Sequence, residues 1–460
     1  MKRRVRLQCA LALLTLVPDV SAQYDTVRVS LQEVIDRAVV VSPDLDAARA
    51  KAQYADSRSS LARVSRYLTE MKVESAFAMV PGLTNPNGVP TGQLYLDPTV
   101  RNDYSSFSPY MQSQFELLQP IYSFGALGGS VRAAAYGAAA ESGVVRTKEL
   151  EVALRAAGLY YSALLADALV NLADQATDVL ALAKREVERL LEEGDPDVDD
   201  ADRYQVLITE QELQSRIREV TEARAIALAG LNRQLLMDEQ ERALPAEAVL
   251  KPLDFIPLPL DEYYALAHGN RPELGQARAG LHAREALVQV ARADYYPQLI
   301  FGVSATVSRA ANRYRQPNPF ISDGFRRTSI RAGIGFRQKL NFAQTKARVA
   351  QAKAQRDEVR HLMTAAEQLV RMDVEQAYRE LSIAEAVLVA QDSSLAISKE
   401  WLRVETINFD LELGNTENLI AAVQMNLELE ARYLEAVRRF NMAVIRLFHA
   451  AGILGTGTLE

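Results

Sequence analysis

The second half of the chain repeats the first half. Ser-Pro-Asp-Leu at residues 42–45 returns as Arg-Pro-Glu-Leu at residues 271–274, and the Ala-X-Ala pattern that follows at 48–50 returns at 277–279 with the same offset. The same register aligns Leu31 with Leu260, Glu33 with Glu262, and Tyr67 with Tyr296. Agreement sustained in one register indicates an internal duplication, in which each copy is one structural unit. We place the first structural repeat at residues 23–245, the second at 246–453 and a C-terminal tail at 454–460.

The N-terminus has the pattern of an export signal. A basic start from Lys2 to Arg6 precedes an apolar run over residues 7–17 and the small-x-small sequence Val20-Ser21-Ala22. We interpret residues 1–22 as a removable signal peptide. The alternative, a membrane anchor, needs about 18 or more apolar residues. The only cysteine, Cys9, lies in this segment, so the processed chain is expected to have neither thiol nor disulfide.

The charge balance narrows the classes of partner. The 460-residue chain has a formal net charge of −7, and loss of the basic N-terminus makes it more acidic. An acidic chain of this kind is not a general nucleic-acid binder. No segment after the signal reads as an apolar membrane-spanning helix, so an exported protein of this kind is soluble in the periplasm, secreted, or a β-barrel.

Two long stretches without proline predict two very long helices, at about 125–193 and 342–412. Apolar residues recur in the second stretch at three- and four-residue steps: Val359, Leu362, Ala366, Leu369, Val370, Val374, Ala377, Leu381, Ala384 and Leu388. This is coiled-coil spacing, and each helix would be about 100 Å long. A polar turn ends each one, and return helices follow at about 201–236 and 418–450. Helices of this length indicate an extended bundle or tube.

Between the opening helix and the long helix of each repeat, the sequence alternates with period two. Four strands are expected, at about 70–80, 109–119, 297–308 and 328–340, with alternating stretches of about nine to eleven residues, which suffice to cross an outer membrane when tilted. Irregular stretches at 81–107 and 309–327 read as extracellular loops. Four strands cannot close a barrel, and open edges are not tolerated in lipid. The chain is therefore expected to oligomerise.

Several motifs, taken in their order, resemble the TolC family of outer-membrane efflux proteins. The segment Gln119-Pro120-Ile121-Tyr122-Ser123-Phe124-Gly125 is similar to that family's passage from strand to long helix. The matching place in the second repeat, residues 338–342, departs from it by having lysine in place of proline and by lacking the glycine. The turn at residues 414–419 resembles the family's helical tip, and residues 448–452 resemble its closing helix. The resemblance covers nearly all of residues 30–453.

The resemblance implies a mainly α fold with a membrane β-barrel portion: a homotrimer whose twelve-stranded β-barrel, in contact with outer-membrane lipid, is continuous with a long α-helical coiled-coil barrel in the periplasm. It implies a conduit and not an enzyme. The protein would be the passive exit duct of a tripartite efflux or type I secretion system, working with a periplasmic adaptor (membrane fusion) protein and an inner-membrane pump. No nucleic-acid partner and no cofactor is expected. The sequence does not indicate the cargo.

An acidic cluster lies in the polar turn between the first long helix and its return helix. Asp195, Asp197 and Asp199, followed by Asp200 and Asp202, would be repeated three times around one opening in a trimer. Carboxylates near a constriction attract cations and repel anions, so we expect a periplasmic entrance with cation selectivity. The alternative is a solvated turn whose aspartates cap the returning helix.

Two further sets of site residues follow from the resemblance and from the strand alternation. The second turn is the expected adaptor-contacting tip, formed by Gly414, Asn415, Thr416 and Glu417. Arg331 and Arg337 would point into the barrel lumen from the non-lipid face of their strand, with Glu116 as their counter-charge.

Other classes of protein explain less of the sequence. A periplasmic coiled-coil scaffold or adaptor accounts for the helices and the export signal but leaves the four amphipathic strands unexplained. An exported enzyme on a helical frame lacks a recognisable catalytic constellation. The four histidines are scattered, without a pair at metal-ligand spacing. The Gly125–Gly129 segment lacks the Lys-Ser/Thr ending of a phosphate loop, and a strand-to-helix junction explains it better.

Overall fold

The structure is a computed structural model of the whole chain, and it describes residues 25–67, 70–84, 101–194, 198–238, 240–311, 313, 320, 323–411 and 416–454. The expected signal peptide at 1–22 lies outside the described residues. So do Asp195 and Asp197 of the acidic turn, and Gly414 and Asn415 of the second tip.

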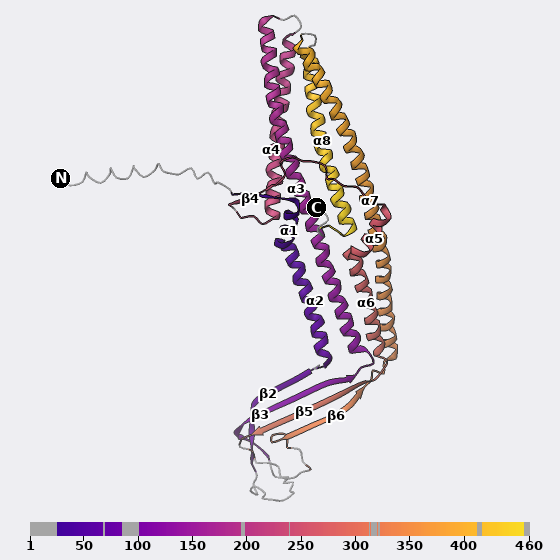
Figure 1. Cartoon of the computed structure of the whole chain (residues 1–460). Coiled ribbons are helices and arrows are strands. Elements are labelled where there is room, and N and C mark those ends of the chain that lie inside the picture. The colour runs from indigo at the N-terminus through magenta and orange to yellow at the C-terminus, as the bar shows by residue number, and fades with distance from the viewer. Residues whose placement is uncertain are drawn as a thin grey trace, which may run out of the picture. The chain divides into compact units, whose positions relative to one another are not determined.

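The order of elements is the same in both halves of the chain (Figure 1). Among the described residues the first half contains β1 (Asp25–Val29), α1 (Leu31–Val41), α2 (Pro43–Tyr67), β2 (Glu70–Thr84), β3 (Arg101–Tyr122), α3 (Ala126–Glu193) and α4 (Asp200–Gln234). The second half contains β4 (Glu241–Pro245), α5 (Leu260–Asn270), α6 (Pro272–Ala293), β5 (Gln298–Ala310), β6 (Thr328–Arg337), α7 (Phe342–Asp410) and α8 (Thr416–Ala451). The protein is mainly helical.

The repeated Ser-Pro and Arg-Pro motifs mark helix breaks, which the sequence interpretation had missed by expecting one opening helix in each repeat. Ser42 ends α1 with φ −68° and ψ 118°, and Arg271 ends α5 with φ −68° and ψ 116°. Pro43 and Pro272 then occupy the first position of the next helices. A residue before proline is driven out of the helical region, whereas proline fits the first turn of a helix.

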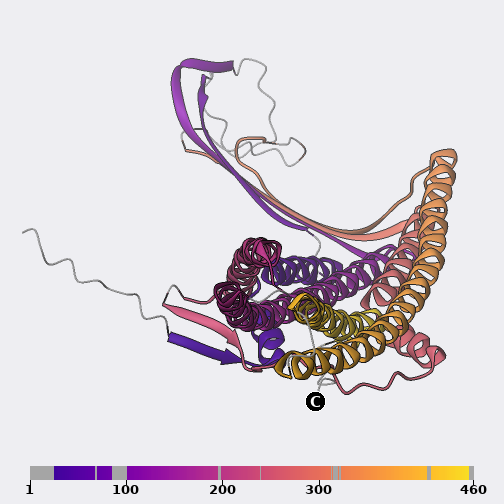
Figure 2. The same ribbon diagram turned by 90° about the horizontal axis from the view of Figure 1, so that it is seen from above.

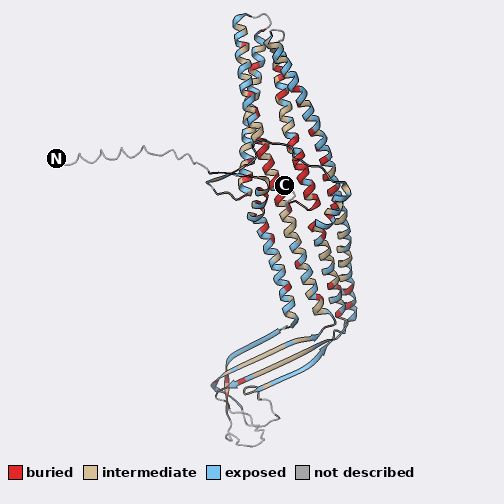
Figure 3. Ribbon diagram, in the orientation of Figure 1, coloured by how far each residue is buried: buried red, intermediate tan, exposed pale blue. Residues whose placement is uncertain are grey.

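Among the described residues, one compact unit contains residues 25–47, 146–271 and 368–454, and so takes segments from both repeats. Its core is the C-terminal part of α8 together with α3. Ile445 and Leu447 of α8 are completely buried, and Tyr160 of α3 is 1% exposed. Buried positions gather along these helices (Figure 3).

Strands β1 and β4 form a small parallel pair in this unit, with Val27 opposite Ala243 (Figure 2). No period-two run is long enough in either segment to predict them. Asn232 of α4 fixes β4, because its side-chain oxygen accepts a hydrogen bond from the backbone N–H of Ala243 at 2.7 Å.

The other unit contains residues 48–145 and 272–367. Its four-stranded antiparallel sheet has the order β2-β3-β5-β6, so β2 and β6 are its two edges (Figure 1). Helix α3 packs closely on α6 here. A Cβ added at Gly129 would lie 2.7 Å from Cγ2 of Val290, so only glycine allows this approach.

The expected bounds were too short for β2 and β3, close for β5 and three residues too long for β6. β2 has 15 residues, β3 has 22 and β5 has 13, whereas β6 has 10. Residues 81–84 and 101–107, expected in a loop, extend the β2–β3 hairpin past an irregularity between Pro81 and Gly82. Proline and glycine were taken as the end of the strand, but a bulge accommodates both without ending the pairing.

Two described helices, α3 and α7, contain 18-residue windows whose mean hydropathies are 1.3 and 1.2, enough by length and composition for a membrane span. This contradicts the expectation that no such segment follows the N-terminus. The test is also met by helices of a packed bundle, because alanine raises hydropathy and is the small residue that lets helices approach.

Candidate functional site

The sheet has one apolar face and one polar face. The apolar face carries large side chains on every strand: Met71, Val73, Phe77, Met79, Phe115, Leu117, Phe301, Val303, Ile334 and Phe336. Several of them are highly exposed, with Phe77 at 77% and Phe336 at 78%. A face this apolar and this exposed is suited to lipid or to another protein surface.

The polar face brings residues of all four strands into one row, and three of them are charged. The strand register pairs Lys72 with Glu116, Glu116 with Ser304, and Ser304 with Arg331. Residues paired in this way point to the same side of a sheet. The structure therefore places Glu116 and Arg331 on one face, as expected, but two strand spacings apart, or about 10 Å. Glu116 accepts a hydrogen bond from the amide of Gln114 at 2.5 Å.

Arg337 lies on the same face, six positions beyond Arg331 and opposite Gln298. Between the two arginines stand Gly333 and Gly335, and Gly302 lies opposite Gly333. These glycines leave a shallow hollow of about 530 Å³, which Glu116, Arg331 and Arg337 help to line. A surface with two guanidinium groups beside bare backbone can attract anions and leaves space for long side chains.

The strand-to-helix junctions are built differently in the two repeats. In the first, Phe124 and Gly125 have positive φ values of 49° and 93°. The hydroxyl of Ser123 accepts a hydrogen bond from the backbone N–H of Leu127 at 3.2 Å, which starts α3. The Gly125–Gly129 segment is thus a junction and a helix start.

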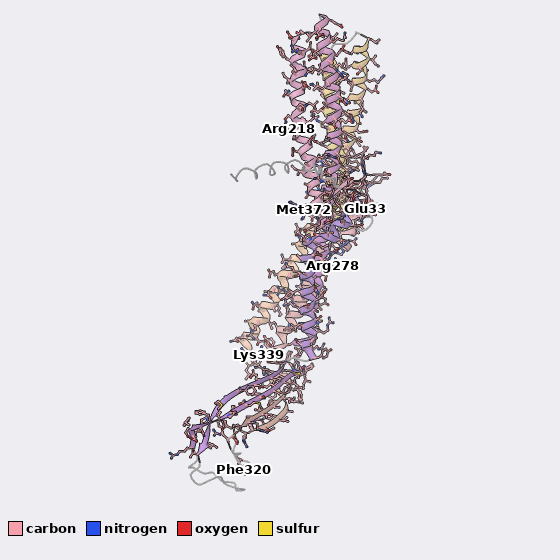
Figure 4. The ribbon with its side chains drawn as sticks, turned by 90° about the vertical axis from the view of Figure 1, so that its left-hand side faces the viewer. Glu33, Arg218, Arg278, Phe320, Lys339 and Met372 are labelled. Carbon is pink, nitrogen blue, oxygen red and sulfur yellow. The ribbon has the colours of Figure 1, made fainter. Side chains whose placement is uncertain are left out.

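In the second repeat, ionic contacts replace this turn. Lys339 forms an ion pair with Asp294 at 3.0 Å, and Arg348 approaches the same carboxylate at 3.5 Å. Figure 4 labels Lys339 beside the helix end of the sheet. The lysine that departs from the family pattern therefore has a structural role at this place.

Asp199 is the N-cap of α4. Its carboxylate accepts hydrogen bonds from the backbone N–H groups of Ala201 at 2.7 Å and Asp202 at 3.3 Å, and the carboxylate of Asp202 accepts one from the N–H of Asp199 at 3.0 Å. This reciprocal arrangement is a capping box. The structure thus contains Asp199 as a helix cap, which was the alternative interpretation. A role of Asp199 in a periplasmic entrance stays a prediction.

The second tip is described only from Thr416 onward. Thr416 is the first residue of α8, and Glu417 is exposed in its first turn. An exposed acid at a helix N-terminus is favoured by the helix dipole and is accessible to a partner.

Ion pairs lie within and between the helices of the first helical hairpin, below its turn. Lys184 of α3 donates a hydrogen bond to Glu210 of α4 at 2.9 Å, and this bond raises the pKa of Lys184. Arg189 pairs with Glu186 and Glu193 along α3. The hydrogen bond from Arg189 lowers the pKa of Glu186. These contacts were not predicted from sequence, although the two pairs of Arg189 have the spacing of neighbouring helical residues.

A groove of about 660 Å³ runs between the two hairpins near these ion pairs. Its walls are mainly apolar, with Leu180, Leu213 and Phe409 among the residues that line it. Gln424 of α8 donates a hydrogen bond to the hydroxyl of Thr209 of α4 at 2.9 Å and so bridges the two hairpins. Nothing in the sequence pattern marked this groove, because it arises from four helices that come together only in the fold.

Across the part of the chain that the structure describes, no group of three or more His, Cys, Asp or Glu side chains is arranged to hold a metal ion. The described part of the fold contains a sheet with distinct faces and two edges that no other described strand pairs, together with hairpins of long helices. Such a surface can bind lipid, line a pore or contact other chains.

Residues 263–447 match the sequence profile of the outer membrane efflux protein family. No curated protein sequence matches the chain at a significant level. Solved structures are similar over nearly the whole fold. CusC, from crystal structures that concern transmembrane channel formation, is 16% identical with a TM-score of 0.74, over 94% of this chain and 93% of that one.

Two further structures give the same result. The open state of the MtrE outer membrane channel of Neisseria gonorrhoeae is 16% identical with a TM-score of 0.73, over 92% of this chain and 88% of that one. The outer membrane protein VceC of Vibrio cholerae is 14% identical with a TM-score of 0.70, over 92% of this chain and 96% of that one. The chain therefore has the fold of outer-membrane channels.

Proposed function

Because this chain carries an outer membrane efflux protein domain over residues 263–447 and has the fold of outer-membrane channels, we propose that it is the outer-membrane exit duct of a tripartite efflux or type I secretion system. In this proposal each copy supplies four strands, and three copies close a twelve-stranded barrel that is continuous with a helical barrel in the periplasm. The protein works passively, with a periplasmic adaptor and an inner-membrane pump.

The observation that carries the proposal is the four-stranded sheet itself. Its apolar face is exposed and its edges, β2 and β6, are unpaired in the described chain. A membrane tolerates strands only in a closed barrel, and about eight strands are the practical minimum. A periplasmic scaffold without a channel is not favoured, because it would leave this apolar face in water.

In such a trimer the polar face of the sheet lines the lumen, where Arg331, Arg337 and Glu116 meet the passing solute. The acidic turn with Asp195, Asp197 and Asp199 would form the periplasmic entrance. The tip with Gly414, Asn415, Thr416 and Glu417 would contact the adaptor. The repeats at 23–245 and 246–453 would then give the tunnel a pseudo-sixfold arrangement of hairpins.

The test is fractionation followed by conductance measurement. We expect the protein in the outer-membrane fraction, soluble only with detergent, as a trimer that conducts ions in planar bilayers. Arg331→Glu should shift the ion selectivity toward cations, whereas Arg331→Lys, which keeps the charge, should not. Recovery without detergent, as a particle that does not conduct, would contradict the proposal.

A further inference from the structure

The two edges of the sheet carry unequal charges at the end where the strands join the helices, called the helix end below. Glu70 is the first residue of β2, three positions after α2 ends, and Arg337 is the last residue of β6, five positions before α7 begins. Both side chains are exposed and both lie on the polar face. Among the described residues, neither has a hydrogen bond or an ion pair within 4.0 Å.

The neighbouring charges leave this contrast intact. Lys72 on β2 is already paired with Glu74 at 2.5 Å. Gly333 and Gly335 of β6 have no side chain. The helix end of the β2 edge is therefore acidic through Glu70, and the helix end of the β6 edge is basic through Arg337.

We propose that, in the trimer on which this inference rests, Arg337 of one copy pairs with Glu70 of the next copy and so sets the register of the seam between copies. The partner is a second copy of this chain. The contact is heterologous, because the β6 edge of one copy meets the β2 edge of another, and such contacts close into rings when the rotation permits.

The register within one copy shows which residues a given stagger of the seam would place opposite each other. A row of paired residues starts at Lys72, two positions from the helix end of β2, and reaches Arg331, six positions from the helix end of β6. The row crosses three strand spacings within one copy, and the fourth spacing is the seam. With a stagger of four residues between copies, the row meets β2 of the next copy at Ala76, and Glu70 then lies opposite Arg337.

This stagger agrees with the geometry of closed barrels. Four residues of stagger for every four strands correspond to a strand tilt of about 35°, given strand spacings of about 4.8 Å and a rise of about 3.3 Å per residue. Barrels of this kind have tilts of about 35–45°. A stagger of two residues would give only about 19° by the same spacings.

The charges of the residues that would face each other distinguish a stagger of four residues from staggers of six or none. A stagger of six residues, with a tilt of about 46°, would place Arg337 opposite Lys72. With no stagger, Arg331 would lie opposite Lys72. Like charges directly opposite each other are unfavourable and opposite charges are favourable. At four residues Arg337 meets Glu70, while Lys72 and Glu74 of the next copy lie over Gly335 and Gly333, which have space for them.

Cysteine pairs can measure this register, because the only native cysteine is Cys9. Opposed residues of neighbouring strands are close enough for a disulfide. We expect the variant with Glu70→Cys and Arg337→Cys to form covalent dimers and trimers on mild oxidation of the full-length protein in outer membranes, seen on non-reducing gels. Each single variant should remain monomeric on those gels and serves as a control.

Two matched pairs report the competing registers. Lys72→Cys with Arg337→Cys tests a stagger of six residues, and Lys72→Cys with Arg331→Cys tests none. Preferential cross-linking of either pair would overturn the inference. Native mass spectrometry of the same samples separates the two proposals: a trimer without the Glu70–Arg337 cross-link overturns the seam and leaves the duct, whereas a monomer overturns both.

Charge reversal tests whether the ion pair contributes to the seam. We expect Glu70→Arg or Arg337→Glu alone to lower the temperature at which the trimer dissociates in detergent. The double variant, which restores the opposite charges in exchanged positions, should recover most of that loss. Equal or additive losses in the double variant would contradict the pairing.

Discussion

Helices α4 and α8 are the last helices of the two repeats, but they differ in how far their side chains are buried. Most positions of α8 from Ala436 to Ala451 are buried. In α4, only Val206, Ala227 and Leu231 are buried among the described residues. Large apolar side chains of α4 are instead exposed: Tyr204 at 59%, Ile208 at 60% and Ile226 at 72%.

The difference shows that two repeats with the same order of elements can bury one helix and expose its equivalent. Helix α8 buries a wide apolar face over its last turns and leaves Arg439 and Arg446 exposed on its other side, which suits a helix that packs on its own chain. Helix α4 keeps apolar side chains that its own chain does not cover, which suits a helix that contacts other copies. The same order of elements thus gives one helix for the core and one for assembly.

The hairpins also differ in what joins their helices. α4 is linked to α3 by the ion pairs Lys184–Glu210 and Arg224–Asp167. α8 is linked to α7 by a buried hydrogen bond from Ser398 to Asn426 at 3.5 Å and by one long ion pair, Arg446–Glu380, at 3.9 Å. The described side-chain contacts between α3 and α4 are thus more strongly charged than those between α7 and α8.

The largest effect is expected in the core of α8. Ile445→Ala should lower the free energy of unfolding by about 2–5 kcal/mol, because it leaves a cavity at a completely buried position. Chemical denaturation followed by circular dichroism measures it. Ile445→Val, which removes one methylene, should cost only about 0.5–1.5 kcal/mol. If both variants unfold like the wild type, α8 is not the core helix.

The next effect distinguishes assembly from folding on α4. Ile226→Ser should lower the stability of the trimer by up to about 1.5–3 kcal/mol per copy, if the side chain becomes fully covered by a neighbouring copy. The helical content of the chain should not change. Native mass spectrometry against detergent concentration or temperature reports the trimer. Unchanged trimer stability would mean that this face of α4 stays in water.

A smaller effect is expected at the turn that begins α4. Asp199→Ala should destabilise the hairpin by about 0.5–2 kcal/mol because it removes the cap. Asp199→Asn keeps the capping oxygen and should restore most of the stability. Thermal unfolding compares the two. If Asp199→Asn lowers the stability as much as Asp199→Ala, the stabilisation comes from the negative charge of Asp199 and not from the capping hydrogen bond.

The acidic entrance can be tested separately at the neighbouring positions. The double variant with Asp195→Asn and Asp197→Asn should leave stability unchanged and reduce the preference for cations in planar bilayers. Unchanged selectivity and unchanged closed-state conductance would remove these two residues from the entrance.

The smallest effect concerns the ion pair between α3 and α4. The hydrogen bond to Glu210 raises the pKa of Lys184 above its ordinary value of 10.5. The stabilisation is therefore fully present below that ordinary value and is lost as the pH rises through the raised one. The stability difference between wild type and Lys184→Met should be small and constant near neutral pH, and should shrink in strong alkali. A difference that does not depend on pH would assign the effect to packing.

Much of the architecture could be predicted from local patterns. The long helices were expected at 125–193 and 342–412 and are found at Ala126–Glu193 and Phe342–Asp410. The resemblance to outer membrane efflux proteins is confirmed by the match of residues 263–447. The strand alternation correctly put Glu116, Arg331 and Arg337 on one face. Their places in a lumen, and the roles of Asp195, Asp197 and the second tip, stay predictions.

What the sequence by itself determined was whatever depends on neighbours along the chain: helix length, from the absence of proline; strand faces, from the period of two; and the internal repeat. Only the tertiary structure decided that α8 is buried and α4 exposed, that β1 pairs with β4, and that Lys72, Glu116, Ser304 and Arg331 share one row. Periodicity is a property of one segment, whereas burial and register depend on which distant segments meet.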